Sequence, residues 1–160
     1  MKKQKGFSLI ELLIVVAIIL IIAAIAIPNL LRSRMAANEA SAVGSLRTLN
    51  TAEVAYSTTY SSIGFTQLTS LGGAAPCTAA TSASACLVDN VLAASPNTKS
   101  GYTFTVTPGT QTPAVTYIST GYPQVLGQSG QRAFCSDQSG VIRANATAGT
   151  CSTTTPDAPI

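Results

Sequence analysis

Glu11 is a carboxylate inside an otherwise apolar stretch of the sequence. Between Phe7 and Ile27 only Ser8 and Glu11 interrupt the hydrophobic side chains. A carboxylate at the middle of a lipid-embedded helix costs up to about 3 kcal/mol, so such a residue usually has a cationic partner or a function. The nearest lysine, Lys5, is on a different face of a helix. Glu11 therefore needs a positive group from elsewhere.

A cut after Gly6 would create such a group. Phe7 would then carry a new positively charged α-amine, one helical turn before Glu11. A second copy of the helix, shifted by about a turn, could pair its own amine with this carboxylate, and the attraction is strong in a medium of low dielectric constant. Glu11 would then fix the register of self-assembly.

The four cysteines are the other residues whose type and number point to chemistry. In a protein whose C-terminal part leaves the cytoplasm, an even number of cysteines favours disulfides. Of the three possible pairings, the sequential one, Cys77 with Cys86 and Cys135 with Cys151, is the most economical. A metal held by all four is the alternative, but no C-x-x-C pair is present, so we expect no metal.

The composition excludes most catalytic chemistry. The 160 residues include no His and no Trp, and only 9% are charged, so no imidazole can serve as a base or a ligand. Three of the nine cationic side chains, Lys2, Lys3 and Lys5, precede the apolar stretch, and the remainder of the chain is electrically balanced. We expect no enzyme activity, no cofactor and no specific nucleic-acid site.

The apolar stretch is long enough to span a membrane. Its 21 residues would give a helix of about 31 Å, close to the thickness of one bilayer core. The lysines before it favour a cytoplasmic N-terminus. A plain anchor and a secretory signal, with Ala24-Ile25-Ala26 as the cleavage site, are alternatives, although the stretch is long for a signal. Pro28 follows and would kink a continuing helix.

A long amphipathic arm and a small head are expected after Pro28. Residues 29–60 contain no proline and one glycine, and apolar side chains recur at helical spacing at Met35, Ala42, Leu46, Leu49 and Tyr56. The charged residues of this segment are expected mostly on other faces, namely Arg32, Arg34, Glu39, Arg47 and Glu53. The helix would then run from Phe7 to Tyr60. We expect Tyr56 and Tyr60 to pack against the head.

The head is expected to comprise residues 61–160. Within it, a loop at 61–100 would precede an antiparallel sheet at 101–160. Residues 102–107 alternate cleanly and place Tyr102, Phe104 and Val106 on one face, and 114–119 form a second strand with Val115 and Tyr117 together. Further strands are expected at 131–136 and 140–144, joined by a tight turn at 137–140. The predicted class is α+β, a three- or four-stranded meander covered by the helical arm.

The residues from Lys5 to Ile19 resemble the N-terminal signature of type IV pilins. The matching features are a short basic leader, Gly6 before the cut, Phe7 after it and Glu11 at the fifth position of the cleaved chain. The resemblance extends to Pro28, where the family also carries a helix-kinking proline. It implies the pilin fold, with a leader at 1–6, a hydrophobic helix at 7–28, an arm at 29–60 and a head whose residues 101–160 include a C-terminal disulfide loop.

The resemblance also implies processing, partners and location. Cleavage after Gly6 and N-methylation of Phe7 would be carried out by a prepilin peptidase and N-methyltransferase. The subunit would wait in the inner membrane with its N-terminus in the cytoplasm, and would join a helical homopolymer outside the cell. An inner-membrane assembly platform and a cytoplasmic ATPase would drive assembly, since this chain has no P-loop.

The expected function is that of a type IVa-like major pilin. Its filament would serve adhesion, twitching motility, DNA uptake or surface sensing. The alternatives are a minor pilin, a pseudopilin of type II secretion, or a membrane-anchored binding module. In the last case Glu11 should be dispensable.

Overall fold

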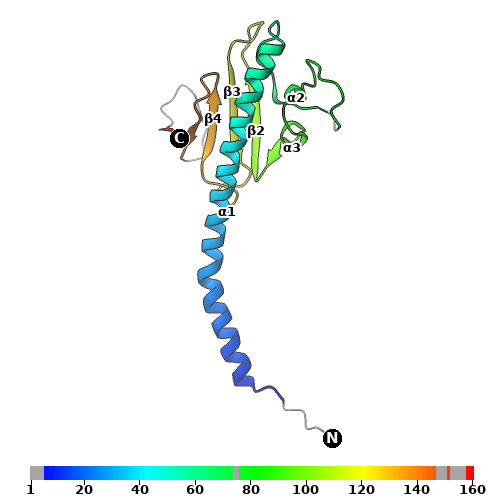
Figure 1. The fold of residues 1–160 in the computed structure, drawn as a ribbon. Coiled ribbons are helices and arrows are strands. Elements are labelled where there is room, and N and C mark those ends of the chain that lie inside the picture. The colour runs from blue at the N-terminus through cyan, green and yellow to red at the C-terminus, as the bar shows by residue number, and fades with distance from the viewer. Residues whose placement is uncertain (1–5, 74–75, 147–150, 152–157) are drawn as a thin grey trace. The chain divides into compact units, whose positions relative to one another are not determined.

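The computed structural model describes residues 6–73, 76–146, 151 and 158–160. The chain divides into two units, residues 1–34 and 35–160. One helix, α1 (Leu9–Thr59), runs through both units, and its part beyond Met35 lies along the sheet of the second unit (Figure 1). Of the leader expected at residues 1–6, only Gly6 lies within the described residues.

Helix α1 follows the predicted span closely. A helix was expected from Phe7 to Tyr60, and α1 begins two residues later and ends one residue earlier. The arm can stay helical because Gly44 is its only glycine and it contains no proline after residue 28. The helix ends where the Tyr60 carbonyl accepts the N–H of Gly64 at 3.1 Å, and Gly64 has a φ of +81°, which other residues rarely adopt.

The predicted apolar face of the arm packs into the head core. Ala42, Leu46, Leu49 and Tyr56 are buried, as expected, whereas Met35 is half-buried. The placement of Glu53 outside this face was wrong, because its side chain is completely buried. Position 53 follows position 49 by four residues and precedes position 56 by three, so a helix places it on the same face regardless of its charge.

The head contains an antiparallel meander. Within the described residues the sheet has six strands in sequential order, each antiparallel to the next. The expected α+β class is confirmed, and the sheet gains two short outer strands that the sequence did not predict, since two-residue strands carry no pattern of their own. The strands are β1 (Thr98–Lys99), β2 (Tyr102–Pro108), β3 (Tyr117–Pro123), β4 (Ala133–Asp137), β5 (Arg143–Asn145) and β6 (Ala158–Pro159).

Strand β2 has the predicted alternation, whereas β3 is displaced along the chain. Tyr102, Phe104 and Val106 are buried together. The expected strand at 114–119 instead starts at Tyr117, and Val115 is 58% exposed, so its grouping with Tyr117 was wrong. Residues 109–116 form a loop, in which Ala114 accepts the N–H of Phe65 at 2.9 Å. This pairing ties the loop to the segment that follows α1.

Strand β4 starts two residues later than predicted and β5 three residues later. The turn before β5 forms where expected. The N–H of Gly140 donates to the Asp137 carbonyl at 2.9 Å, and Gly140 has a φ of +72°. The Asp137 carboxylate also accepts the N–H of Ser139 at 2.9 Å. An aspartate and a glycine at these two turn positions explain why the chain reverses here.

The loop at 61–100 contains two one-turn helices that the sequence did not predict. Helix α2 (Leu68–Leu71) buries its two leucines, and helix α3 (Asn90–Ala93) buries Leu92 and Ala93. The Asp89 carboxylate accepts the N–H of Leu92 at 2.8 Å and so caps α3. Tertiary packing of these leucines, rather than a periodic pattern, holds such short helices.

The cysteines form the sequential pairs. Cys77 is bonded to Cys86 and Cys135 to Cys151, with Cα–Cα distances of 6.1 and 5.7 Å. Cys135 and Cys151 are buried beside Ala133, so this bridge belongs to the interior, whereas Cys77 is exposed. With all four sulfurs bonded in pairs, the alternative of a metal held by four thiolates does not apply.

Candidate functional site: the N-terminal segment and the helical arm of the head

The first unit has an apolar surface that is exposed among the described residues. By length and composition α1 can cross a membrane, and its most apolar window has no buried residues. A helix that is apolar on all sides is ordinarily buried in lipid or among other helices. Its large apolar side chains are between 45% and 79% exposed, and they are Leu9, Ile10, Leu12, Leu13, Ile14, Val15, Val16, Ile18, Ile19, Leu20, Ile21, Ile22, Ile25, Ile27, Leu30 and Leu31.

The expected cleavage site lies just before the helix. Gly6 and Phe7 are exposed and precede the first helical residue, Leu9. The Phe7 side chain is 78% exposed, and a Cβ added to Gly6 would meet no atom within 4 Å. Exposed, non-helical backbone is what a protease requires. The bond between Gly6 and Phe7 is therefore sterically open.

Glu11 has a hydrogen-bond partner within its own chain, which was not among the predictions from the sequence. The N–H of Ser8 donates to Glu11 Oε2 at 2.9 Å, and the Ser8 carbonyl accepts the N–H of Leu12 at 3.3 Å. Ser8 directly precedes the helix and Glu11 is its third residue, which is the spacing of a capping box. The sequence pattern Ser-x-x-Glu, here Ser8 and Glu11, is the pattern that predicts such a cap. The hydrogen bond holds the Glu11 carboxylate at the start of α1.

Pro28 lies inside α1 rather than at its end. Because proline has no N–H, the carbonyl of Ala24 lacks its usual partner four residues on, and the ring crowds the same carbonyl. A kink at this point stays a prediction.

Asn50 connects the arm to two strands of the head. Its Oδ1 accepts the Tyr117 hydroxyl at 3.0 Å, and its Nδ2 donates to the Ser136 hydroxyl at 2.8 Å. Strands β3 and β4 are thus each bonded to the same side chain of α1. Such a half-buried amide with both ends satisfied fixes the position of the helix on the sheet.

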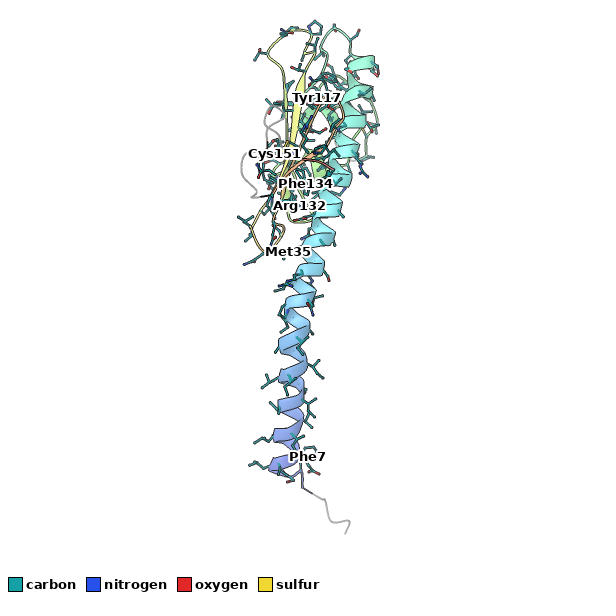
Figure 2. The ribbon with its side chains drawn as sticks, turned by 90° about the vertical axis from the view of Figure 1, so that its left-hand side faces the viewer. Phe7, Met35, Tyr117, Arg132, Phe134 and Cys151 are labelled. Atoms are coloured by element: carbon teal, nitrogen blue, oxygen red, sulfur yellow. A yellow bond between two sulfur atoms is a disulfide. The ribbon has the colours of Figure 1, made fainter. Side chains whose placement is uncertain are left out.

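Glu39 ties the arm to the start of β4. Its Oε1 accepts the backbone N–H groups of Gln131 and Arg132 at 2.9 and 3.2 Å, and Arg132 forms an ion pair with Oε2 at 2.7 Å. Burial raises the pKa of Glu39, but these hydrogen bonds and the guanidinium charge outweigh it and hold the pKa below its ordinary value. Figure 2 shows Arg132 near the end of the head from which α1 continues to Met35.

Replacing this carboxylate should loosen the head. We expect Glu39→Ala to lower the free energy of unfolding by about 1–2 kcal/mol, because two backbone donors and Arg132 lose a charged acceptor while water replaces part of it. Urea unfolding of the full chain in detergent measures the change. Arg47→Ala, which removes an exposed charge from the same helix, should leave the midpoint unchanged. Equal midpoints for both variants would contradict this role of Glu39.

Glu53 is the second charged residue that the arm brings to the head. Its Oε2 accepts the N–H of Thr66 at 3.0 Å, whereas its buried Oε1 has no partner among the described residues. Burial raises the pKa of Glu53 to about 7, although the Thr66 hydrogen bond lowers it. Burial, and then the charge of Glu53, raise the pKa of the Tyr117 hydroxyl to about 12.

Comparison with known proteins places the N-terminal segment in a family. Residues 1–27 match the family described as "Prokaryotic N-terminal methylation motif". The chain is 64% identical over 39 residues to the type IV wide pilus major component PilA4 of Thermus thermophilus, and 46% identical over 54 residues to the type IV major pilin protein PilA of Myxococcus xanthus. These stretches are 24% and 34% of this chain.

The similarity covers only part of each protein. The matched stretches make up 30% of the Thermus protein and 24% of the Myxococcus protein, so the chain spans less than a third of the length of either relative. No solved structure matches the chain. The similarity to type IV major pilins therefore lies in the segment that carries the methylation motif and opens α1, a helix that continues into an antiparallel α+β head.

Proposed function

We propose that the protein is a major pilin, a structural subunit that polymerises into a type IV pilus. The observation that carries this proposal is the uncovered apolar surface between Leu9 and Leu31, which directly follows the motif. Full burial of one such side chain is worth about 1.5–3 kcal/mol, so a bundle of these helices gains a large stabilisation from assembly. The two relatives named above are also major components of type IV pili.

Assembly begins with processing at the site before α1. A prepilin peptidase removes residues 1–6 and the new Phe7 amine is methylated. The lysines of the leader keep the N-terminus in the cytoplasm, and the head lies on the far side of the inner membrane, where its cysteines can be oxidised. The assembly platform and its ATPase then move subunits from the membrane into the fibre. The filament serves adhesion, twitching motility, DNA uptake or surface sensing.

Register within the filament comes from Glu11. The Phe7 amine of one subunit pairs with the Glu11 carboxylate of a neighbour, so that the apolar helices stack at a fixed offset. Pro28 would bend each helix between its part in the filament core and its part in the head. No residue has a catalytic role in this function, in keeping with a structural protein.

Mass spectrometry of sheared filaments tests the proposal. The dominant protein of the sheared fraction should begin at a methylated Phe7, and its intact mass should be lower by four hydrogens because of the Cys77–Cys86 and Cys135–Cys151 bonds. The abundance of the chain separates a major pilin from a minor pilin or a pseudopilin. Recovery of the chain from filaments with Lys2 still attached would overturn the proposal.

A further inference from the structure

The connection between β3 and β4 exposes two adjacent apolar side chains. Val125 is 50% and Leu126 62% exposed, and the segment from Gln124 to Gln131 contains no charged residue. Single exposed apolar residues are ordinary on a protein surface, but two neighbours in an uncharged turn form a small exposed apolar patch. We call Val125 and Leu126 the apolar tip.

The apolar tip is held in place by hydrogen bonds across its turn. The Ser129 hydroxyl and the Ser129 N–H both donate to the Val125 carbonyl, at 3.0 and 2.9 Å. The N–H of Gly127 donates to the Gly130 carbonyl at 2.9 Å, and Gly127 has a φ of +79°. The two side chains are thus displayed by a defined turn and lose little entropy when they enter an apolar phase.

The same turn is fastened to α1 close to the end of the apolar segment. The Asn38 side chain donates to the Ser129 carbonyl at 2.9 Å, and Glu39 accepts the N–H of Gln131 at 2.9 Å. Asn38 follows Leu31, the last exposed leucine of the apolar segment, by seven residues, and α1 is helical throughout this interval. Seven helical residues span about 10 Å.

This chain length brings the tip within reach of a membrane surface. The headgroup layer on each side of a bilayer is about 5–7 Å thick. Arg32 and Arg34, between the apolar segment and Asn38, are exposed and can extend their charged ends to lipid phosphates. Counted along the helix, Asn38, to which the turn is bonded, therefore lies only a few ångströms beyond the headgroup layer when Leu31 is at the edge of the acyl chains.

We propose that the apolar tip inserts into the boundary between headgroups and acyl chains of the membrane that holds the unassembled subunit. The insertion would bring the head into contact with the membrane surface and would limit the orientations of the head before the subunit enters a filament. Extraction into the filament would withdraw Val125 and Leu126 from lipid. This inference rests on the proposed function, because it requires residues 9–31 to span the membrane.

A single tryptophan tests the insertion directly, because the natural chain has none. Full-length Leu126→Trp is reconstituted into vesicles of phosphatidylcholine and phosphatidylglycerol, with or without bromine on the acyl chains. We expect brominated lipid to reduce the emission of this variant at least twofold, and its emission maximum to lie at shorter wavelength than in Val115→Trp. Val115 is the matched control, since it is 58% exposed and lies in the β2–β3 loop, at the other end of β3.

The possible outcomes separate the two proposals. Vesicle flotation first establishes whether each variant is inserted, and failure to float would contradict the proposed function. If the Leu126→Trp chain floats but is quenched no more than Val115→Trp, the tip does not enter lipid and the inference is wrong. Protection of the Leu126→Trp side chain that requires a high ratio of protein to lipid would assign the tip to a second copy of the chain, and would also overturn the inference.

Discussion

Glu11→Ala is expected to abolish surface filaments while the protein remains in the membrane. In the proposed filament each Glu11 carboxylate neutralises the Phe7 amine of a neighbour in an apolar core. Removing one partner of such a buried pair costs about 3 kcal/mol or more, which is over a hundredfold in each association step. Immunoblots of the sheared and membrane fractions measure the effect. Normal filaments in this variant would defeat the register hypothesis.

The matched control is Glu11→Gln, because the structure gives Glu11 a second role. The N–H of Ser8 donates to its carboxylate, and an amide oxygen can accept this bond equally well. Loss of the cap alone would weaken the start of α1 by about 1 kcal/mol. The register hypothesis therefore predicts that Glu11→Gln fails to form filaments, like Glu11→Ala. Filaments in Glu11→Gln but not in Glu11→Ala would assign the function of Glu11 to the capping box.

The long helix and its motif could be predicted because their signals are local. The apolar run from Phe7, the helical spacing of Ala42, Leu46 and Leu49, and the alternation of β2 depend on neighbours in sequence, and the structure shows each of them. The capping bond between Ser8 and Glu11 is equally local. A carboxylate in an apolar run first suggests a need for a cation, but the Ser-x-x-Glu spacing also predicts a hydrogen bond to the backbone before the helix.

The remaining features depend on contacts between distant segments. The outer strands β1 and β6 are only two residues long. Strand β3 begins late because Ala114 is bonded instead to Ile63 and Phe65, in the segment after α1. Val115 is exposed for the same reason. The prediction placed Glu53 outside the buried face because charged side chains usually lie on the surface. Its position in the helix nevertheless puts it on the face that packs into the core.

Glu53→Gln is expected to remove the main pH dependence of the stability of the head near neutrality. The folded pKa of Glu53 is about 7, against an ordinary value of 4.5. Below pH 4.5 both the folded and the unfolded chain carry the proton. Between pH 4.5 and 7 the unfolded chain releases it and the folded chain keeps it, so stability falls as pH rises, and this fall ends above pH 7. The shift corresponds to about 3 kcal/mol.

A neutral amide at position 53 has no proton to release. Glu53→Gln can still accept the Thr66 N–H, which preserves the only hydrogen bond that the structure gives the Glu53 side chain within the described residues. Its stability should therefore be nearly flat between pH 5 and 7, where the parent chain loses most of the about 3 kcal/mol. Urea midpoints of the full chain in detergent, followed by tyrosine fluorescence at each pH, measure the two slopes.

Glu39→Gln provides the control, because the pKa of Glu39 is shifted in the opposite direction. Its folded pKa is lowered, so the stabilisation from Glu39 is present above the unfolded pKa and is lost only as pH falls through the folded value. Glu39→Gln should be less stable than the parent chain near neutrality and keep the parent slope between pH 5 and 7. If Glu53→Gln also keeps that slope, the Glu53 carboxylate is already ionised in the folded head, and its buried Oε1 must then find a donor that compensates its charge.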